Sequence, residues 1–366
     1  MDIEVRRAEP SEARLVQVAP PALGENQVRL TIERFGLSTN NVTYAFMGDF
    51  MKYWDFFPTA DPDTWGRVPV WGFATVAESR HADVPVGERL FGYLPMSDEL
   101  VITAGRVSAR TLSDVSEHRA HLPGAYNSFA RCAADPIYRA DRESVQMLLF
   151  PLFFTSFVID DFLSDNDDFG AAALVISSAS SKTSIGVAHL AKARGRKTVG
   201  LTSPANIAFT RSLGLYDVVV AYADVASLPV EPAAFIDVAG NAAVVRAVHE
   251  HYGDKLAHSM VVGATQIKAN DGADRGPLPG PKPAFLFAPT QIAKRTGEWG
   301  ADELNARVAE AWDAFAGTVG RWMEVEIVVG PDEVVDVFSE LVAGEVDPRV
   351  GFVCTLDEGE PTTRHS

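Results

Sequence analysis

The segment from residue 174 to residue 224 predicts a strand, a tight Ser-rich turn, a helix, a second strand, a second helix and a third strand, in that order. This order and spacing are typical of the first half of a doubly wound dinucleotide-binding domain, because short buried strands alternate with helices that cross back over a parallel sheet. The leading interpretation of the chain is therefore a cofactor-dependent oxidoreductase.

The turn after the first strand contains the residues that would bind the cofactor's pyrophosphate. It holds five Ser and one Thr in the eight positions 177–184, and a helical pattern follows over 185–193. A strand that leads straight into a helix N-terminus leaves unpaired backbone N–H groups at one point, which suits a pyrophosphate. The glycines of the usual GxGxxG fingerprint are missing, so an ordinary N-cap-rich turn fits equally well. The predicted phosphate-binding residues are Ser178, Ala179, Ser180, Ser181, Lys182, Thr183 and Ser184.

The end of the second strand predicts which nicotinamide cofactor would bind. An Asp or Glu usually follows this strand where the adenosine ribose carries no phosphate, but here Thr202 and Ser203 follow it. Arg211 on the next helix and Tyr222 at the third strand add a cation and a hydroxyl, which favours a 2′-phosphate and NADPH over NADH. Arg211 also fits a solvated helix position. Later strand ends add the small residues Gly240, Gly263 and Thr265 to the predicted cofactor site.

Several motifs resemble those of one enzyme superfamily. They are PPALGENQVRLTIERFGLSTNNVTYAFMGD, VPVGERLFGYLPM, HLAKARG, and DVAGN followed by VVGAT. With them the chain resembles the medium-chain dehydrogenase/reductase superfamily, specifically its zinc-free branch of quinone oxidoreductases and enoyl reductases. The Ser-rich turn, with AYN and FAPTQIAKR downstream, is similar to a bacterial subfamily of unassigned function.

The resemblance implies an α/β protein with two domains. We expect a GroES-like β-barrel substrate domain over residues 1–155, a Rossmann NADP-binding domain with a doubly wound parallel sheet over 156–319, and a return to the substrate domain over 320–366. It also places Thr155 against the nicotinamide, and makes 285–288 the edge of a homodimer. Gln291, Lys294 and Arg295 would then lie near the cofactor, with the two cations on a 2′-phosphate or a substrate acid; an exposed helix start is the equal alternative.

Composition restricts the partners. The formal net charge of −17 over 366 residues disfavours nucleic acid and anionic membranes, which require a basic face. We expect no stretch that is long and apolar enough to span a bilayer, since the nearest candidate, 147–159, is interrupted by Pro151. No secretory leader opens the chain, so we expect a cytoplasmic protein.

A metal site is not expected. The two cysteines cannot form a four-Cys structural zinc site. Where the superfamily's alcohol dehydrogenases supply a catalytic Cys, the resemblance places Ser38, Thr39, Asn40 and Asn41.

A metal-free reductase must polarise its acceptor by hydrogen bonds and protonate it from a side chain or water. The resemblance places Tyr44 on the active-site loop, so it is the first candidate for the proton donor, and Tyr53 is the second. Asn41 would hold a substrate oxygen or the nicotinamide ribose, or else serve as a turn residue. Aromatic side chains over 53–57, including Phe56, would wall a flat apolar substrate or anchor a loop to the core.

The segment 107–145 is rich in hydrogen-bond donors and looks longer than in common members of the superfamily. Its candidates for contacting a small-molecule substrate are Tyr126, Asn127 and Arg142, although arginines in long surface loops often pair with nearby acids. Two functions remain open: a metal-free NADPH-dependent reductase of an activated C=C, quinone or carbonyl compound, and a non-catalytic nucleotide-binding or sensor protein on the same fold.

Overall fold

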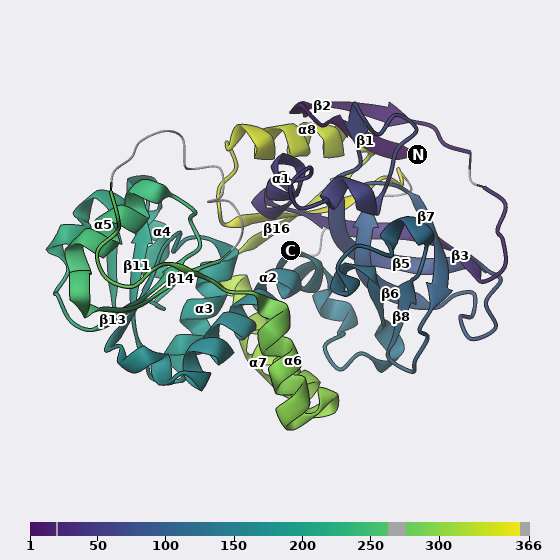
Figure 1. Cartoon of the computed structure of the whole chain (residues 1–366). Coiled ribbons are helices and arrows are strands. Elements are labelled where there is room, and N and C mark those ends of the chain that lie inside the picture. The colour runs from purple at the N-terminus through teal and green to yellow at the C-terminus, as the bar shows by residue number, and fades with distance from the viewer. Residues whose placement is uncertain (20, 263–275, 359–366) are drawn as a thin grey trace. The chain divides into compact units, whose positions relative to one another are not determined.

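The computed structural model describes residues 1–19, 21–262 and 276–358 (Figure 1). The chain divides into two compact units, Met1–Leu148 with Met323–Ser366 and Leu149–Trp322. The first division falls inside helix α2, Glu143–Asp165. Each unit has its own sheet and its own core, and each is described by itself.

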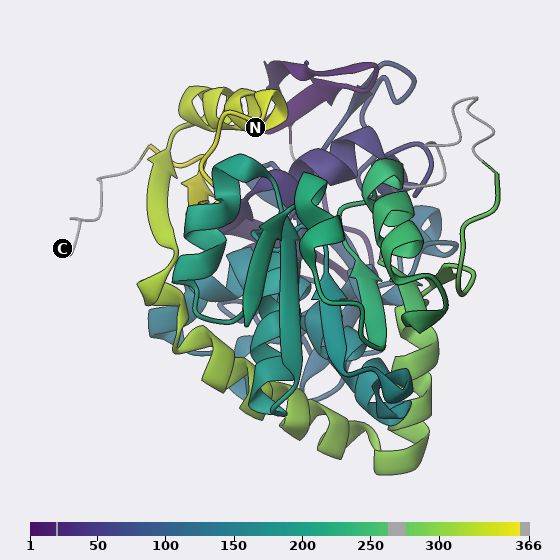
Figure 2. The ribbon, with the colours of Figure 1, turned by 90° about the vertical axis from the view of Figure 1, so that its left-hand side faces the viewer.

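The second unit contains a parallel six-stranded sheet in the order β12-β11-β10-β13-β14-β15 (Figure 2). This order reverses next to β10, which is the mark of a doubly wound sheet. The strands are β10 (Ala173–Ile176), β11 (Lys197–Thr202), β12 (Val218–Ala221), β13 (Ala233–Asp237), β14 (Leu256–Val261) and β15 (Ala284–Phe285). The helices are α3 (Lys182–Ala193), α4 (Ile207–Ser212), α5 (Ala242–Tyr252), α6 (Ala288–Trp299) and α7 (Ala301–Ala316).

Burial on both faces explains the apolar strands of this sheet. Val175 belongs to a core cluster that includes residues of α5, whereas Leu174 and Ile176 belong to one with residues of α2 and α3. Alternate residues of a strand point to opposite faces, so a strand covered on both sides must be apolar throughout. The predicted Rossmann domain is therefore confirmed as a fold.

The first unit contains a closed barrel. Its strands are β3 (Gln27–Leu37), β5 (Pro69–Ser79), β6 (Arg89–Pro95), β9 (Ser128–Arg131), β8 (Thr111–Asp114) and β7 (Glu99–Gly105), which neighbour one another in this order. The additional antiparallel pairing of β3 with β7 closes the ring. The predicted GroES-like barrel is thereby confirmed.

Further elements extend the first unit beyond the barrel. Strands β16 (Glu324–Val329) and β17 (Val350–Thr355) continue the sheet beyond β3, so the C-terminal segment belongs to this unit. A small sheet of β1 (Asp2–Arg6), β2 (Glu9–Val16) and β4 (Trp65–Gly66) and the helices α1 (Thr39–Phe46) and α8 (Pro331–Ala343) complete it.

Helix α2 corrects one expectation. Pro151 lies inside the helix without ending it, and Phe153 stacks on Phe315 of α7 with 4.9 Å between the ring centroids. As a result, Ala140–Asp165 is long and apolar enough to cross a membrane by length and composition, although no such stretch was expected. Half of its apolar window is buried inside the protein. Core helices pass the same test, so this is weak evidence for a membrane span.

Candidate functional site

The Ser-rich turn lies between the carboxyl end of β10 and the N-terminus of α3. Ser178 has a left-handed backbone with φ of +50°, a conformation that glycine usually adopts. Ser181 is the N-cap of α3 and accepts a hydrogen bond from the Ser184 N–H at 3.3 Å. The helix therefore begins at Lys182, three residues before the predicted start, because the hydroxyl cap stabilises an additional turn.

A buried side chain connects this turn to the neighbouring strand β13. The Ser177 hydroxyl donates to Asp237 Oδ1 at 2.8 Å and accepts from the backbone N–H groups of Val238 and Ala239 at 2.8 and 2.9 Å. The N–H of Gly240 donates to the same carboxylate oxygen at 3.3 Å. Gly240 has φ of +65°, so its conformation suits glycine. The ends of β10 and β13 are thus fixed to each other.

Most serines of the turn bind other groups of the chain. Ser180 is 8% exposed and accepts hydrogen bonds from Asn206 Nδ2 at 3.1 Å and from the buried Thr202 hydroxyl at 3.4 Å. The buried Ser184 hydroxyl donates to the Ser177 carbonyl at 2.8 Å. These side chains stabilise the turn, which favours the alternative of an ordinary N-cap-rich turn for Ser180 and Ser184.

Tyr216, which was not predicted as a site residue, also binds the turn. Its hydroxyl donates to the carbonyls of Ala179 at 2.9 Å and Ser184 at 3.1 Å. Gly200 makes room for it, because a Cβ at this position would lie 2.9 Å from Ala179 Cβ and 3.0 Å from the Tyr216 ring. A lone Tyr between two strands gave no sequence signal for this contact.

The turn still offers groups that would suit an anion. The backbone N–H groups of the first turn of α3 and the Lys182 ammonium lie at the helix N-terminus, together with the half-buried Thr183 hydroxyl. Tyr222 comes directly after β12 and begins a 3₁₀ turn. Burial raises the pKa of Tyr222, and hydrogen bonds from the Ser178 N–H and hydroxyl lower it by less. Tyr222 therefore interacts with Ser178 of the turn, and its predicted place near a ribose stays a prediction.

Other predicted cofactor contacts have mixed outcomes. Arg211 is exposed and donates to the Val219 carbonyl at 3.2 Å, which supports the solvated-helix interpretation. Ser203 is half-buried at the end of β11. Thr155 donates to the Pro151 carbonyl at 3.3 Å within α2. Gly263 and Thr265 lie outside the described residues.

The cations of α6 were expected near a phosphate, but they pair with α2. Arg295 Nε lies 2.8 Å from Asp161, and its Nη2 lies 3.0 Å from Asp165. Lys294 forms an ion pair with Asp165, and Gln291 donates to Asp161 at 2.5 Å. These contacts attach α6 to α2, so both cations already pair with carboxylates, and their predicted phosphate contact stays a prediction.

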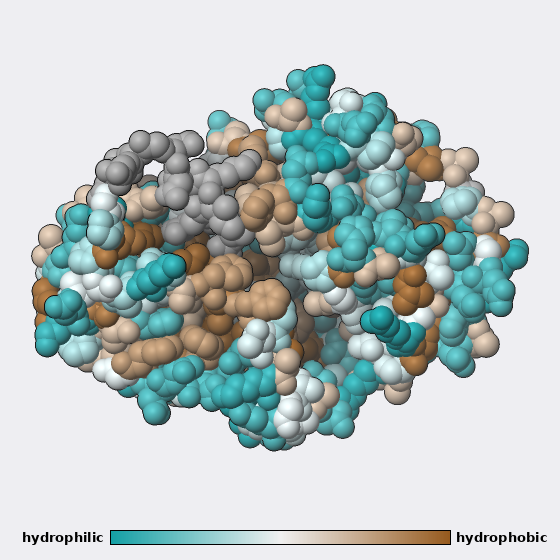
Figure 3. Space-filling model, viewed as in Figure 1, coloured by the Kyte–Doolittle hydropathy of each residue, from teal (hydrophilic) through white to brown (hydrophobic). Residues whose placement is uncertain are grey.

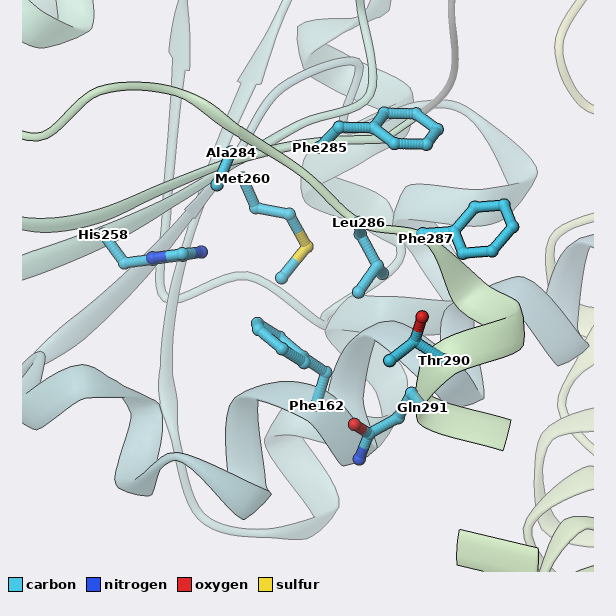
Figure 4. A pocket seen from close by; sticks show the side chains of 9 residues that line it. All are labelled: Phe162, His258, Met260, Ala284, Phe285, Leu286, Phe287, Thr290 and Gln291. Atoms are coloured by element: carbon cyan, nitrogen blue, oxygen red, sulfur yellow. The ribbon is translucent and has the colours of Figure 1, made fainter. Parts of the chain in front are cut away.

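A small apolar cavity lies next to this contact. It measures ≈ 200 Å³ (Figure 4). His258 and Gln291 are its polar boundary, and the pKa of His258 is lowered by burial. Its remaining lining consists of Phe162, Met260, Ala284, Phe285, Leu286, Phe287 and Thr290.

The second candidate site is an aromatic cluster in the first unit. Tyr44 on α1 lies 4.7 Å from Tyr53 and 5.6 Å from Tyr93 between ring centroids. The ring centroid of Tyr93 lies 4.7 Å from that of Tyr126 and 5.1 Å from that of Trp71 on β5. The structure therefore brings together the three tyrosines that were predicted at positions 44, 53 and 126, together with two aromatic residues that were not predicted.

The phenols of this cluster are strongly perturbed. Burial raises the pKa of Tyr44, Tyr93 and Tyr126 well above the ordinary value of a phenol, and nearby phenols raise it further. Burial also raises the pKa of Tyr53 to about 12. All of these groups hold their protons at neutral pH, so each can donate a hydrogen bond or a proton.

Two predicted contacts have structural roles instead. Asn41 Oδ1 accepts from the Ser38 N–H at 2.9 Å and its Nδ2 donates to the Pro69 carbonyl at 3.0 Å. It completes a capping box on α1 and ties this helix to β5. Phe56 is 1% exposed and packs against Tyr93 with 5.2 Å between ring centroids. Both observations favour the alternatives of a turn residue and a core anchor.

A buried arginine packs against Phe57, another aromatic residue of this cluster. Arg119 is 1% exposed, its Nε lies 3.1 Å from Asp114 Oδ2, and its guanidinium lies 4.6 Å from the Phe57 ring centroid. Burial lowers the pKa of Arg119. Asn127, a predicted substrate contact, donates to the Arg119 carbonyl at 3.2 Å and is buried. Arg142, another such contact, is half-buried in a 3₁₀ turn before α2.

Within the described part of the chain, no three His, Cys, Asp or Glu side chains are grouped as metal ligands would be.

The closed barrel and the parallel sheet together define the fold of the medium-chain dehydrogenases and reductases. The chain belongs to the family described as "Protein of unknown function (DUF2855)", whose model matches residues 35–347. No curated protein matches the chain.

Solved structures share this fold at low sequence identity. CurA from Vibrio vulnificus, solved with NADPH, has a TM-score of 0.59 at 15% identity over 94% of each chain. The quinone oxidoreductase from Coxiella burnetii has a TM-score of 0.56 at 14% identity over 97% of this chain and 99% of that chain. The yhdH oxidoreductase from Salmonella enterica, solved with NADP, has a TM-score of 0.53 at 11% identity over 97% and 99%. The predicted resemblance is confirmed as a likeness of fold.

Proposed function

We propose that the protein is a cytoplasmic, metal-free reductase that uses NADPH to reduce an activated C=C, quinone or carbonyl compound of low molecular weight. The observation that carries the proposal is the fixed turn between β10 and α3, next to the point where the strand order of a doubly wound sheet reverses. Similar structures solved with NADPH or NADP support the choice of cofactor.

The residues of the turn fit a dinucleotide. Backbone N–H groups and Lys182 at the start of α3 would hold the pyrophosphate. Ser203 at the end of β11 would lie near the ribose, where the absence of an acid avoids repulsion of a 2′-phosphate. When bound, the reduced nicotinamide would supply a hydride.

Tyr44 is the proposed proton donor in this reaction. Its hydroxyl accepts a hydrogen bond from Trp71 Nε1 at 3.4 Å, and its buried phenol is protonated at neutral pH. A positioned acid that meets the charge left by hydride addition speeds such a reduction.

Lys182→Ala is expected to weaken NADPH binding by about tenfold or more, because one charge-assisted contact of ~1.5–3 kcal/mol is lost. The affinity is measured by titration of reduced-nicotinamide fluorescence. Lys255→Ala is the matched control, since it removes the same charge just before the amino end of β14, whereas the turn follows the carboxyl end of the parallel strand β10. An unchanged affinity in Lys182→Ala would exclude the proposed phosphate contact.

A non-catalytic nucleotide sensor is the second candidate. The side chains at the positions of the missing glycines favour it, because they leave less room for a pyrophosphate against the backbone. If NADPH binds and no enone, enoyl thioester or quinone then oxidises it, the sensor becomes the better account.

We also propose that the protein is a homodimer joined through β15. This strand forms the edge of the sheet, and Phe285 and Phe287 are 56% and 59% exposed. Apolar surface gathers around the segment that leads into α6 (Figure 3). An uncovered apolar edge strand invites pairing with another chain.

Phe285→Lys is expected to convert a dimer to a monomer in sedimentation experiments, because a charge at the strand edge opposes pairing. Val230→Lys is the control, since Val230 is 54% exposed but lies outside any strand. A monomeric wild-type protein, or a Phe285→Lys variant that is still dimeric, would contradict the interface.

A further inference from the structure

We propose that Asn40 and Trp71 are positioning residues for Tyr44: their two N–H groups hold its oxygen so that the phenolic proton is free for the substrate, and they stabilise the phenolate that proton transfer leaves. This inference rests on the proposed function, in which Tyr44 is the acid.

The two donors come from different elements. Asn40 precedes Tyr44 by four residues on α1, which places both side chains on one face of the helix. Trp71 lies on β5, and its Nε1 is 3.4 Å from the Tyr44 oxygen. Asn41 fixes these elements to each other, because it binds the carbonyl of Pro69, two residues before Trp71. The geometry therefore depends on the fold and not on a flexible loop.

Ring contacts fix the orientation of both aromatic partners. The Trp71 ring stacks on Phe91 with 5.7 Å between centroids and an interplanar angle of 26°. The Tyr44 ring packs between Tyr53 and Tyr93. Rotation of either ring would break these contacts, so the direction of the indole N–H is set before any ligand arrives.

Among the described residues, no acceptor is found for the hydroxyl proton of Tyr44. A phenol oxygen can accept two hydrogen bonds and donate one. Here it accepts from Trp71 Nε1 at 3.4 Å, and an interaction with the Asn40 side chain lowers its pKa. No hydrogen bond found among the described residues has the Tyr44 hydroxyl as its donor. We infer that Trp71 and Asn40 both donate to the phenol oxygen, which leaves a ligand oxygen or carbanion as the recipient of the proton.

The two donors also act on the charge that the reaction creates. In the proton transfer, the O–H bond of Tyr44 breaks, its electron pair stays on oxygen, and the proton bonds to the substrate atom that became negative on accepting hydride; water then reprotonates Tyr44. Burial and the neighbouring Tyr126 raise the pKa of Tyr44, whereas the hydrogen bonds from Trp71 and Asn40 lower it. A donor binds phenolate more strongly than phenol, so both residues ease this step.

The test replaces Tyr44 by a trifluorotyrosine, whose phenol titrates near neutral pH in water, and follows phenolate absorbance in the full-length protein. Trp71→Phe and Asn40→Leu are each expected to raise the pKa at position 44 by about one unit, a tenfold change in the acid dissociation constant. Thr43→Ala on the exposed face of α1 is the matched control and is expected to change nothing. Unchanged values in both Trp71→Phe and Asn40→Leu would overturn the inference.

A second measurement avoids the fluorinated residue. The indole N–H proton of Trp71, assigned by its loss in Trp71→Phe, is expected to move upfield in the NMR spectrum of Tyr44→Phe, because its acceptor is gone. An unmoved resonance would also overturn the inference. Neither readout depends on turnover. If Trp71→Phe and Asn40→Leu raise the pKa at position 44 but the wild-type protein reduces no substrate, only the proposed function is refuted. If the protein is an active reductase and these variants leave the pKa unchanged, only this inference is refuted.

Discussion

Tyr44→Phe is expected to lower turnover by about 10²–10⁴-fold, the usual contribution of a positioned general acid. The ring and its packing against Tyr53 and Tyr93 are kept, so the loss isolates the proton. NADPH affinity should not change, because the proposed phosphate contacts belong to the turn before α3. Single-turnover oxidation of NADPH with an accepted substrate measures the rate.

Tyr53→Phe is the matched control for this prediction. The Tyr53 hydroxyl interacts with Tyr126, so its removal leaves the hydrogen bond that Trp71 donates to Tyr44 in place. We expect a much smaller decrease in turnover. Wild-type turnover in Tyr44→Phe would remove this residue as the acid, and a larger loss in Tyr53→Phe would transfer the role to Tyr53.

Asp114→Asn is expected to reduce the free energy of unfolding by about 3–5 kcal/mol, the usual cost of leaving a buried charge without its partner. The cation of Arg119 is 1% exposed, and Asp114 is its one ion-pair partner among the described residues. Denaturant unfolding, followed by the fluorescence of the tryptophans, measures the change.

The double variant Asp114→Asn with Arg119→Met distinguishes charge from packing. Removing both charges should recover a large part of the lost stability, because the desolvated cation is gone and a long apolar side chain still covers Phe57. A double variant as unstable as Asp114→Asn alone would show that other contacts of Asp114, such as those with the N–H groups of Thr103 and Ser116, carry its effect.

The parallel sheet could be predicted from the sequence because its signals are local. An apolar run such as 174–176, then a turn rich in N-cap residues, then a helical pattern defines a βαβ unit without knowledge of distant contacts. The long helix around Pro151 was predicted poorly, since tertiary packing overrides the helix-breaking tendency of proline.

The details of the site depend on contacts between distant segments, which a single sequence does not display. Tyr216 binds carbonyls 37 and 32 residues away, and Arg119 pairs with Asp114 only because strand β8 ends beside a 3₁₀ turn. Trp71 lies 27 residues from Tyr44 in the chain, so no local pattern connects the two side chains. Residue type alone therefore overestimated the hydroxyls available to a phosphate and missed the groups that hold the turn and the phenol.

Titration of the purified protein with NADPH and with NADH, followed by reduced-nicotinamide fluorescence and thermal shift together, shows whether the Ser-rich turn binds a dinucleotide. We expect tight NADPH binding with a raised melting temperature, and much weaker binding of NADH. Absence of binding by either cofactor would contradict it, because the Ser-rich turn before α3 would then hold no dinucleotide.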